Sequence, residues 1–272
     1  MAAELTHTRM EAVLSGRRRR RLTRFAIYAT LALLVIWSID VTVIQDTDWE
    51  RMGSIGNVWQ SAQRFLGVDL ALIPDLVHPT IETLMIATLG TLLGVAICIP
   101  AAWFGALNIT PFAPITYPLA RFMMTVSRSI HEIVWALIFV AAVGLGAFAG
   151  VLAIAVRSIG FIAKMSAEAI EDFDPHPVEA MRAVGANPIQ VMRYAILPQV
   201  LPVILGIIIF EWEINIRRSA ILGLVGAGGL GLVFFRQMNT FNYPGVTTVI
   251  LAILVLILLG EVLSYYSRKA LI

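Results

Sequence analysis

Long apolar runs separated by short polar segments occupy most of the chain. A run of about 20 residues is the length that an α-helix needs to cross the hydrocarbon core of a bilayer. Runs of this kind lie at residues 25–44, 80–102, 119–143, 146–165, 200–222 and 247–266. The pattern therefore predicts an all-α integral membrane protein with about six transmembrane helices, five of them in a core at residues 80–266.

The polar ends of the chain predict its orientation. Residues 1–24 form a basic arm with seven arginines, and the tail at residues 267–272 carries Arg268 and Lys269. Because Lys and Arg favour the cytoplasmic side, both termini are expected in the cytoplasm. The run at residues 25–44 is expected to remain as an anchor helix, since no small-residue cleavage site follows it.

Residues 45–79 follow the anchor and are expected on the outer side, where their acidic excess agrees with this orientation. One helical face is indicated by five residues spaced three or four apart: Met52, Ile55, Trp59, Ala62 and Leu66. A helix at the membrane interface and a short helix packed on the transmembrane body explain this spacing equally well. A short cytoplasmic loop before residue 119 is indicated by three prolines: Pro111, Pro114 and Pro118.

The composition supports a membrane location. Hydrophobic residues make up 58% of the chain and charged residues 14%, and the mean hydropathy is +0.83, far from the balance of a soluble domain. The single cysteine, Cys98, allows no intrachain disulfide, and the histidines are too scattered to form a metal site. We expect no metal, no cofactor bound by this chain and no nucleic-acid partner.

Two nucleotide-binding motifs are excluded by their context. The string GAGGLG at residues 226–231 spells the GxGxxG of a dinucleotide loop, but that loop requires a preceding strand, and here an apolar span precedes it. We interpret these glycines as residues that either allow helices to pack closely or form an irregular turn that lines a cavity. The two lysines, Lys164 and Lys269, follow Ala163 and Arg268, so the chain has no Walker A loop. Energy from ATP would have to come from another chain.

The longest polar segment expected in the cytoplasm after the N-terminal arm lies at residues 167–198. Its sequence predicts two short helices around a glycine elbow. Pro177 is expected near the start of the first helix, and Glu179 in its first turn. Gly185 is expected to end that helix in the left-handed conformation. Asn187 is expected to cap the second helix, with Pro188 at its first position. Such a projecting hairpin suits docking into a groove on a partner.

This segment resembles the EAA loop of the permeases of ATP-binding-cassette (ABC) importers. In that family E-A-A is followed by three residues, Gly, nine residues, Ile, one residue and Leu-Pro. The chain has Glu179-Ala180-Met181, Gly185 and Leu197-Pro198 at this spacing. Met181 stands in place of the third alanine and Ala195 in place of the isoleucine, and both exchanges are apolar.

The resemblance implies a type I ABC importer permease fold and a docking role for the loop. Glu179, Ala180, Gly185 and Leu197 would couple closure of the ATPase to the membrane helices. Two ATPase subunits would bind ATP and Mg, and a second permease copy and an extracytoplasmic substrate-binding protein would complete the complex. The chain itself would be no enzyme, and would be a multi-pass protein of the cytoplasmic (inner) membrane of a bacterium, embedded in the lipid bilayer.

Two further stretches are similar to the phosphonate and phosphate uptake branch of this family. They are RSIHEIVWALIFVAAVGLGAFAGVLAIAVRSIG from Arg128 and EINIRRSAILGLVGAGGLG from Glu213. His131 departs from the first motif, where proline is expected, and leaves open how the helix starts there. The likeness covers residue 119 to the C-terminus and implies a phosphorus oxyanion as the substrate.

Charged residues inside apolar runs are costly and are functional candidates. Arg217 and Arg218 lie in the outer part of the fifth run, against the cytoplasmic bias of positive charge. They are expected to face an anion path, for which Glu213 is also a candidate. Alternatively, Arg217 pairs with Glu213 four residues earlier, or the arginines snorkel to the headgroups. Arg157 is expected to pair with a carboxylate such as Glu132, and is a further candidate for the path.

The leading interpretation is thus the permease of an ATP-driven importer of phosphonate, phosphate or a related phosphorus oxyanion that works by alternating access. The alternative is a gradient-driven secondary transporter or channel for a small anion, which would need coupling carboxylates and often has inverted repeats. A membrane phosphatase ranks last, because no set of nucleophile, base and acid is recognisable.

Overall fold

In the computed structural model, residues 2–46 and 55–271 are described, and they form helices joined by turns with no strand among them. The chain divides after Ala62 into two units, which are considered separately.

The first unit contains the expected anchor. Helix α1 (Ala2–Ile39) continues into a π-helical turn, η1 (Asp40–Gln45), and α3 (Ile55–Gln63) follows later. The segment long and apolar enough to span a membrane is Arg20–Gln45, and none of it is buried. The helix begins well before residue 25 because Ala, Glu, Leu and Arg in the arm are good helix formers. Of the expected interfacial face, Trp59 is exposed, and Met52 lies outside the described residues, so that role stays a prediction.

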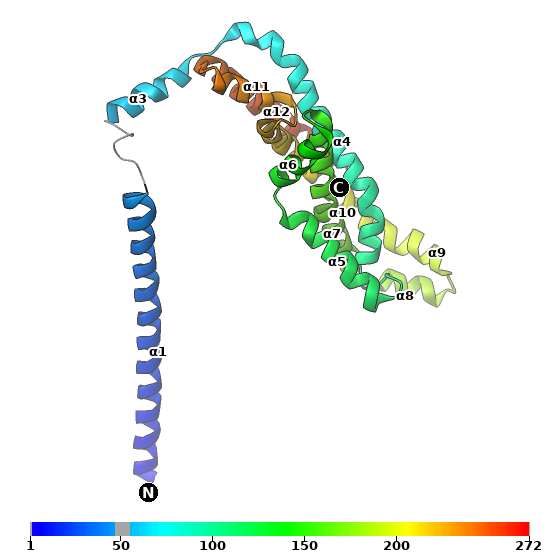
Figure 1. The fold of residues 1–272 in the computed structure, drawn as a ribbon. Helices are drawn as coiled ribbons and strands as arrows, with labels where there is room; N and C mark the ends of the chain where they lie inside the picture. The colour runs from blue at the N-terminus through cyan, green and yellow to red at the C-terminus, as the bar shows by residue number, and fades with distance from the viewer. Residues whose placement is uncertain (1, 47–54, 272) are drawn as a thin grey trace. The chain divides into compact units, whose positions relative to one another are not determined.

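The second unit begins with two short 3-10 turns, η2 (Arg64–Leu66) and η3 (Leu70–Leu72). The long helices of this unit are α4 (Ile73–Gly105), α5 (Ala113–Ser129), α6 (Glu132–Val143), α7 (Ala147–Glu171), α10 (Leu197–Leu222) and α12 (Tyr243–Leu271). Shorter elements are α8 (Pro175–Ala183), α9 (Pro188–Val191), the π-helical turn η4 (Met192–Ile196), the 3-10 turn η5 (Gly223–Val225) and α11 (Gly229–Asn239). Figure 1 shows α8 and α9 at one end of this unit and α11 toward the other.

Among the described residues, five helical segments are long and apolar enough to cross a membrane, or six if a bent pair counts as one span. The bent pair is α5 and α6, which meet at an angle of 88°. The span expected at residues 119–143 therefore consists of two helices joined at a sharp bend. Both halves are apolar, so the hydrophobic pattern does not reveal the break between them.

His131 creates this break by starting a new helix. Its ring nitrogen Nδ1 accepts a hydrogen bond from the backbone N–H of Ile133 at 3.3 Å, which caps α6. His131 has a φ of −65°, the value that a proline ring imposes, and Ile130 before it is extended. The histidine thus adopts the backbone of the expected proline and adds a side-chain cap.

The predicted proline loop also differs from the structure. Pro114 lies at the start of α5 and Pro118 inside it, and Pro111 alone remains in the connection from α4. Proline is tolerated in the first turn of a helix because that turn has no partner for the missing N–H. The connection between α4 and α5 is therefore shorter than its three prolines suggest.

Helices α4 and α7 pack against each other along small residues. A Cβ atom added to Gly90 would lie 2.7 Å from Ile154 Cγ2, and one added to Gly94 would lie 2.9 Å from Ser158 Cβ. Such small residues let helix backbones approach closely in a membrane, where dispersion forces and hydrogen bonds replace the hydrophobic effect. This close approach holds α7, which carries Arg157, against the rest of the unit.

The GAGGLG string forms an irregular turn after η5 and the start of α11. Gly226, Gly228 and Gly229 have φ values of +89°, +81° and +69°, which strongly favour glycine. The turn is tied to its neighbours because Gly226 O accepts from Gly146 N at 2.9 Å and Leu230 N donates to Thr83 Oγ1 at 2.8 Å. The glycines therefore serve close packing of a membrane turn.

We expect Gly90→Ala and Gly206→Ala to change stability in opposite directions. Alanine is the better helix former by about 1 kcal/mol, and a Cβ at Gly206 meets nothing within 4 Å, so that variant should be slightly more stable. At Gly90 the added methyl overlaps Ile154, and overpacking costs about 1–3 kcal/mol. Thermal unfolding of the purified chain in detergent measures both, and equal shifts would contradict the close packing of α4 on α7.

Candidate functional site

The polar segment forms the expected hairpin, defined here as residues 174–196. Helix α8 begins at Pro175, two residues before the expected Pro177, because Asp174 caps it by accepting from His176 N at 3.0 Å. The Asp174 carboxylate also bonds His176 Nδ1 at 2.6 Å. This side-chain bond, together with the backbone bond, lowers the pKa of the Asp174 carboxyl below its ordinary value.

The elbow of the hairpin has the predicted geometry. Gly185 has a φ of +81°, and Ala186 N donates to Met181 O at 3.0 Å, which closes the end of α8. Asn187 then caps α9, since its Oδ1 accepts from Gln190 N at 2.9 Å while Gln190 Oε1 accepts from Asn187 N at 2.8 Å. This reciprocal pair is a capping box, and it fixes where the second helix starts.

A small apolar core holds the two arms of the hairpin together. Val178, Val191 and Ala195 are buried in it, and Met181 packs against them. The two departures from the EAA pattern thus lie in one cluster, where the larger Met181 offsets the volume lost at Ala195.

The outer face of the hairpin is exposed and partly apolar. Glu179 and Ala180 are exposed on α8, and Val184 and Ile189 are 79% and 78% exposed beside the elbow. Leu197, at the start of α10, is 45% exposed. An exposed apolar surface of this kind is typical of an interaction site.

An ion pair between Arg121 and Glu171 lies at the base of the hairpin. Arg121 on α5 donates through Nε to Gly105 O at 2.9 Å and pairs with Glu171 Oε2 at 2.7 Å. Glu171 also accepts from Leu107 N at 2.8 Å. The C-terminal ends of α4 and α7 therefore meet α5 at Glu171, the residue where α7 ends, three residues before the cap of α8.

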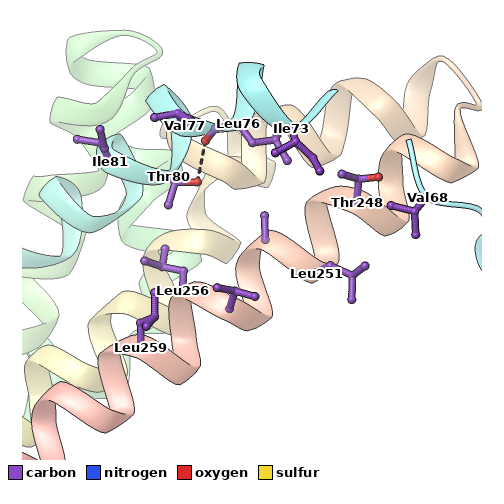
Figure 2. Close-up of a pocket in the computed structure, with 12 residues that line it drawn as sticks. Val68, Ile73, Leu76, Val77, Thr80, Ile81, Thr248, Leu251, Leu256 and Leu259 are labelled. Carbon is purple, nitrogen blue, oxygen red and sulfur yellow. Dashed lines mark hydrogen bonds between the residues drawn. The ribbon is translucent and has the colours of Figure 1, made fainter. Parts of the chain in front are cut away.

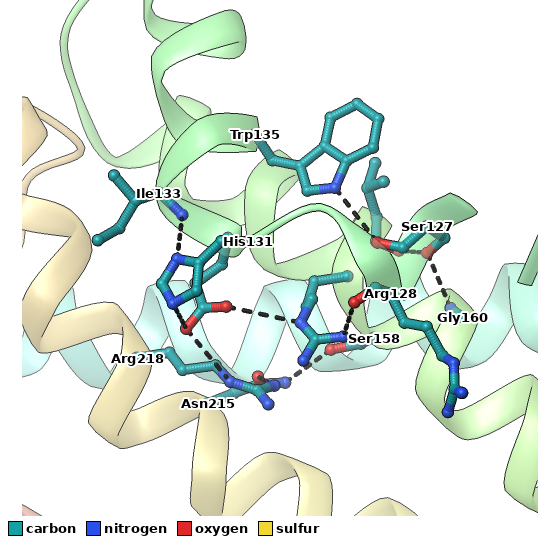
Figure 3. Close-up of polar contacts among 12 residues, drawn as sticks. Ser127, Arg128, His131, Ile133, Trp135, Ser158, Gly160, Asn215 and Arg218 are labelled. Carbon is teal, nitrogen blue, oxygen red and sulfur yellow. Dashed lines mark hydrogen bonds and ion pairs between the residues drawn. The ribbon is translucent and has the colours of Figure 1, made fainter. Parts of the chain in front are cut away.

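The second candidate site is a charge cluster within the spans, defined as Glu132, Arg157, Glu211 and Arg218. Arg218 pairs through Nη1 with Glu211 Oε1 at 2.7 Å and with Asn215 Oδ1 at 3.0 Å, and Figure 3 shows Arg218 and Asn215 together on α10. Glu211 is fully buried, and its pairing with Arg218 neutralises a charge that would be costly if it were isolated within the membrane.

Arg157 completes the cluster from α7. Its Nε lies 3.5 Å from Glu132 Oε2, which confirms the predicted pairing, and its Nη1 donates to Arg128 O at 2.8 Å. Arg218 Nε lies 3.6 Å from the other oxygen, Glu132 Oε1. One carboxylate at the start of α6 thus bridges arginines from α7 and α10.

Neutral side chains extend the cluster into a hydrogen-bonded network. Asn215 Nδ2 donates to Ser158 Oγ at 2.8 Å and to Thr91 Oγ1 at 2.9 Å, and Ser158 Oγ donates to Glu211 Oε1 at 3.2 Å. Asn215, Ser158 and Thr91 were not among the residues predicted from the sequence. The sequence does contain a signal for Asn215. Its spacing from Glu211 and Arg218 is i, i+4, i+7, which places all three on one face of α10.

Arg217 lies apart from its neighbour Arg218. Its Nη2 is 3.8 Å from Glu213 Oε1, its side chain is 48% exposed, and Glu213 Oε2 also binds Arg268 Nη2 at 3.2 Å. The structure therefore separates the two arginines that the sequence groups together. Arg218 belongs to the charge cluster, and Arg217 with Glu213 belongs to a contact between α10 and α12.

The lining of the groove between the start of α4 and α12 contains no charged side chain, unlike the charge cluster. Figure 2 shows it lined by aliphatic side chains such as Val77, Leu251 and Leu256, with Thr80 and Thr248 the polar side chains of its lining. Both threonine hydroxyls bond carbonyl oxygens of their own helices, Leu76 O at 2.7 Å and Pro244 O at 2.9 Å. A groove of this kind suits lipid chains and has no group to recognise an anion.

Residues 98–272, more than half of the chain, match the family model described as "Binding-protein-dependent transport system inner membrane component". The chain belongs to this family. It is thus a multi-pass permease of the inner membrane and the membrane component of an ABC importer, which also contains an ATPase and a substrate-binding protein.

This chain is similar in sequence to named permeases over most of its length. It is 35% identical over 253 residues to the phosphite transport system permease protein PtxC of Stutzerimonas stutzeri, covering 92% of this chain and 89% of the relative. It is 39% identical over 202 residues to the phosphate-import permease protein PhnE of Mycolicibacterium smegmatis, covering 74% of this chain and 38% of that one. Among solved structures, an inward-facing MetNI methionine ABC transporter chain matches with a TM-score of 0.65 and 25% identity, over 75% of this chain and 100% of that chain.

We expect Arg218→Gln to destabilise the permease far more than Arg217→Gln. Loss of Arg218 leaves buried Glu211 without its cation, which costs about 3–5 kcal/mol. Loss of the half-exposed Arg217 removes a long ion pair worth less than about 1 kcal/mol. Unfolding by SDS titration in mixed micelles measures both free energies, and similar losses in the two neighbours would contradict the separation of their roles.

Proposed function

We propose that this permease imports phosphonate, phosphate or a related phosphorus oxyanion such as phosphite, by ATP-driven alternating access. The observation that carries the proposal is the likeness, over 92% of the chain, to a permease named for phosphite, with a second relative named for phosphate. Two arginines at membrane depth, Arg157 and Arg218, supply the chemistry that binds such oxyanions, since guanidinium groups match their geometry.

The complex would contain two copies of the permease, two ATPase subunits that hold ATP and Mg, and one substrate-binding protein. The break between α5 and α6 supports a second copy, because non-helical backbone at membrane depth is tolerated only against protein or a water-filled path. Both termini would lie in the cytoplasm, as the basic arm and tail favour.

Coupling would run from the hairpin into α10. Glu179 and Ala180 are presented on its exposed face, and Gly185 sets the angle between its arms. From Leu197 the chain continues as one helix to Leu222 and carries Glu211 and Arg218. A displacement of the hairpin by an ATPase would therefore move these two charges relative to Glu132 and Arg157.

Within the membrane we assign Arg157 and Arg218 to the substrate path. Arg217 and Glu213, with Arg268, would instead hold α10 to α12. This assignment follows the burial of the two sets. The charge cluster comes from three helices and is linked through Asn215 to a fourth, whereas Arg217 lies at the surface of the single chain.

Uptake by proteoliposomes tests the function. Vesicles that hold the permease with its ATPase and binding protein should accumulate labelled phosphate or phosphite only when the ATPase has ATP, and methylphosphonate should compete. Vesicles with an ATPase that cannot hydrolyse ATP are the control. Uptake that ignores ATP and follows an imposed ion gradient would instead favour the secondary transporter.

Substitutions at the elbow test the coupling role. Gly185→Val should abolish stimulation of ATP hydrolysis by loaded binding protein, because a β-branched residue is strained at a φ of +81° and would change the angle of the hairpin. Gly185→Asn is the matched control, since asparagine tolerates the left-handed conformation and should retain most of the stimulation. Full stimulation in Gly185→Val, with normal membrane insertion, would refute the coupling assignment.

A further inference from the structure

The Glu132 carboxylate lies between two arginines. Its Oε2 faces Arg157 Nε at 3.5 Å, and its Oε1 faces Arg218 Nε at 3.6 Å. Both distances exceed the 2.7–3.2 Å of an N–H···O hydrogen bond, and Arg157 Nε has no hydrogen-bond partner among the described residues. The carboxylate thus neutralises both guanidinium groups but binds neither of them tightly.

The two guanidinium groups are each held in place without Glu132. Arg218 is fixed through Nη1 by Glu211 and Asn215, at 2.7 and 3.0 Å. Arg157 is fixed through Nη1 by the carbonyl oxygen of Arg128 at 2.8 Å. The anchors use one nitrogen of each group and leave the Nε side directed toward Glu132. A pair of arginines preorganised in this way keeps its geometry when the anion between them is exchanged.

The surroundings of this position include polar side chains that are not buried in the single chain. Arg157 lies 10 residues into α7, which is about 15 Å along the helix at 1.5 Å per residue and therefore well inside the span. Beside it, His131 at the break between α5 and α6 has a side chain that is 64% exposed. Figure 3 shows the Arg128 side chain turned away from the labelled residues of the network, and it has no ion pair within the described part of the chain. Polar side chains exposed at this depth need water or a partner subunit beside them.

We propose that Glu132 is a built-in substitute for the transported oxyanion, which displaces it from between Arg157 and Arg218 during each cycle. The inference rests on the proposed function and names the site within it. When no substrate is present, Glu132 closes the site and keeps the two arginines neutralised. When the oxyanion enters, its oxygens take the positions of the carboxylate oxygens, and the carboxylate swings toward the exposed break.

The charges of the cluster limit which anion fits. With Glu132 in place, two arginines balance two glutamates; once Glu132 has moved, Glu211 alone opposes Arg157 and Arg218, which leaves one positive charge. A singly charged oxyanion restores neutrality in a region where unbalanced charge is costly. Glu132 also opposes leakage, because without substrate it occupies the position between Arg157 and Arg218 where another anion would bind.

Binding of labelled inorganic phosphate to the permease–ATPase complex in nanodiscs tests the proposal, with and without ATP and without binding protein. Glu132→Gln removes the competing charge and keeps the shape of the side chain. It should bind phosphate about tenfold more tightly than the unmodified complex, or better, because hydrogen bonds to charged groups are then made without displacing an ion pair. Adding Arg157→Gln to this variant should abolish the gain.

Glu213→Gln is the matched control. Glu213 is also a largely buried carboxylate between two arginines, Arg217 at 3.8 Å and Arg268 at 3.2 Å, but it belongs to the contact between α10 and α12. Its substitution should leave phosphate affinity unchanged. If Glu132→Gln does not assemble, Glu132→Asp is the second variant. Its shorter side chain moves the carboxylate away from the two arginines, so phosphate binding should strengthen by a smaller factor.

Equal phosphate binding in Glu132→Gln and the unmodified complex, or an equal gain in Glu213→Gln, would overturn the proposal, and so would the absence of binding in every nucleotide state. These outcomes are distinguishable from failure of the proposed function. If the unmodified complex imports phosphite or phosphate with ATP and the variants do not differ, only the role of Glu132 is wrong. If it imports no phosphorus oxyanion, the proposed function itself fails.

Discussion

The absence of water inside a bilayer is the constraint on which the structure of this permease depends. A charge there must be neutralised by another side chain, and backbone groups must find partners within the protein. Glu211 shows the consequence, because it is fully buried and is bound by Arg218 and Ser158. Four helices contribute to its network, so the requirement to neutralise a few charges also fixes how these helices are arranged.

Close packing along small residues makes this arrangement possible. Gly90 and Gly94 let α4 approach α7, which brings Thr91 and Ser158 within reach of Asn215 on α10. The glycine turn at residues 226–231 similarly draws α11 against Thr83 of α4. In a solvent as apolar as the side chains themselves, short contacts and interhelical hydrogen bonds supply the association that the hydrophobic effect supplies in water.

The hairpin continues directly into α10, the helix that carries Glu211 and Arg218 of the charge cluster. The capping box of Asn187 and Gln190 and the left-handed Gly185 define a rigid projection, and α10 begins where the projection ends. Arg121 and Glu171 tie the other side of its base to α4, α5 and α7. A motion of the projection therefore reaches Arg218 through a single helix, while the helices that carry Glu132 and Arg157 are held by other contacts.

The sequence by itself determined the features that depend on local chemistry. Apolar run length predicted the spans, glycine and asparagine predicted the elbow and its cap, and the EAA spacing predicted the family, because each signal is carried by neighbouring residues. The bend between α5 and α6 was not predicted, since both halves are apolar and the capping atom belongs to a histidine where proline was expected. Only the tertiary structure separated Arg218 from Arg217 and joined Glu132, Arg157, Glu211 and Asn215 into one network. Those partners are far apart in sequence, and which of them meet is decided by the rotation and close approach of the helices.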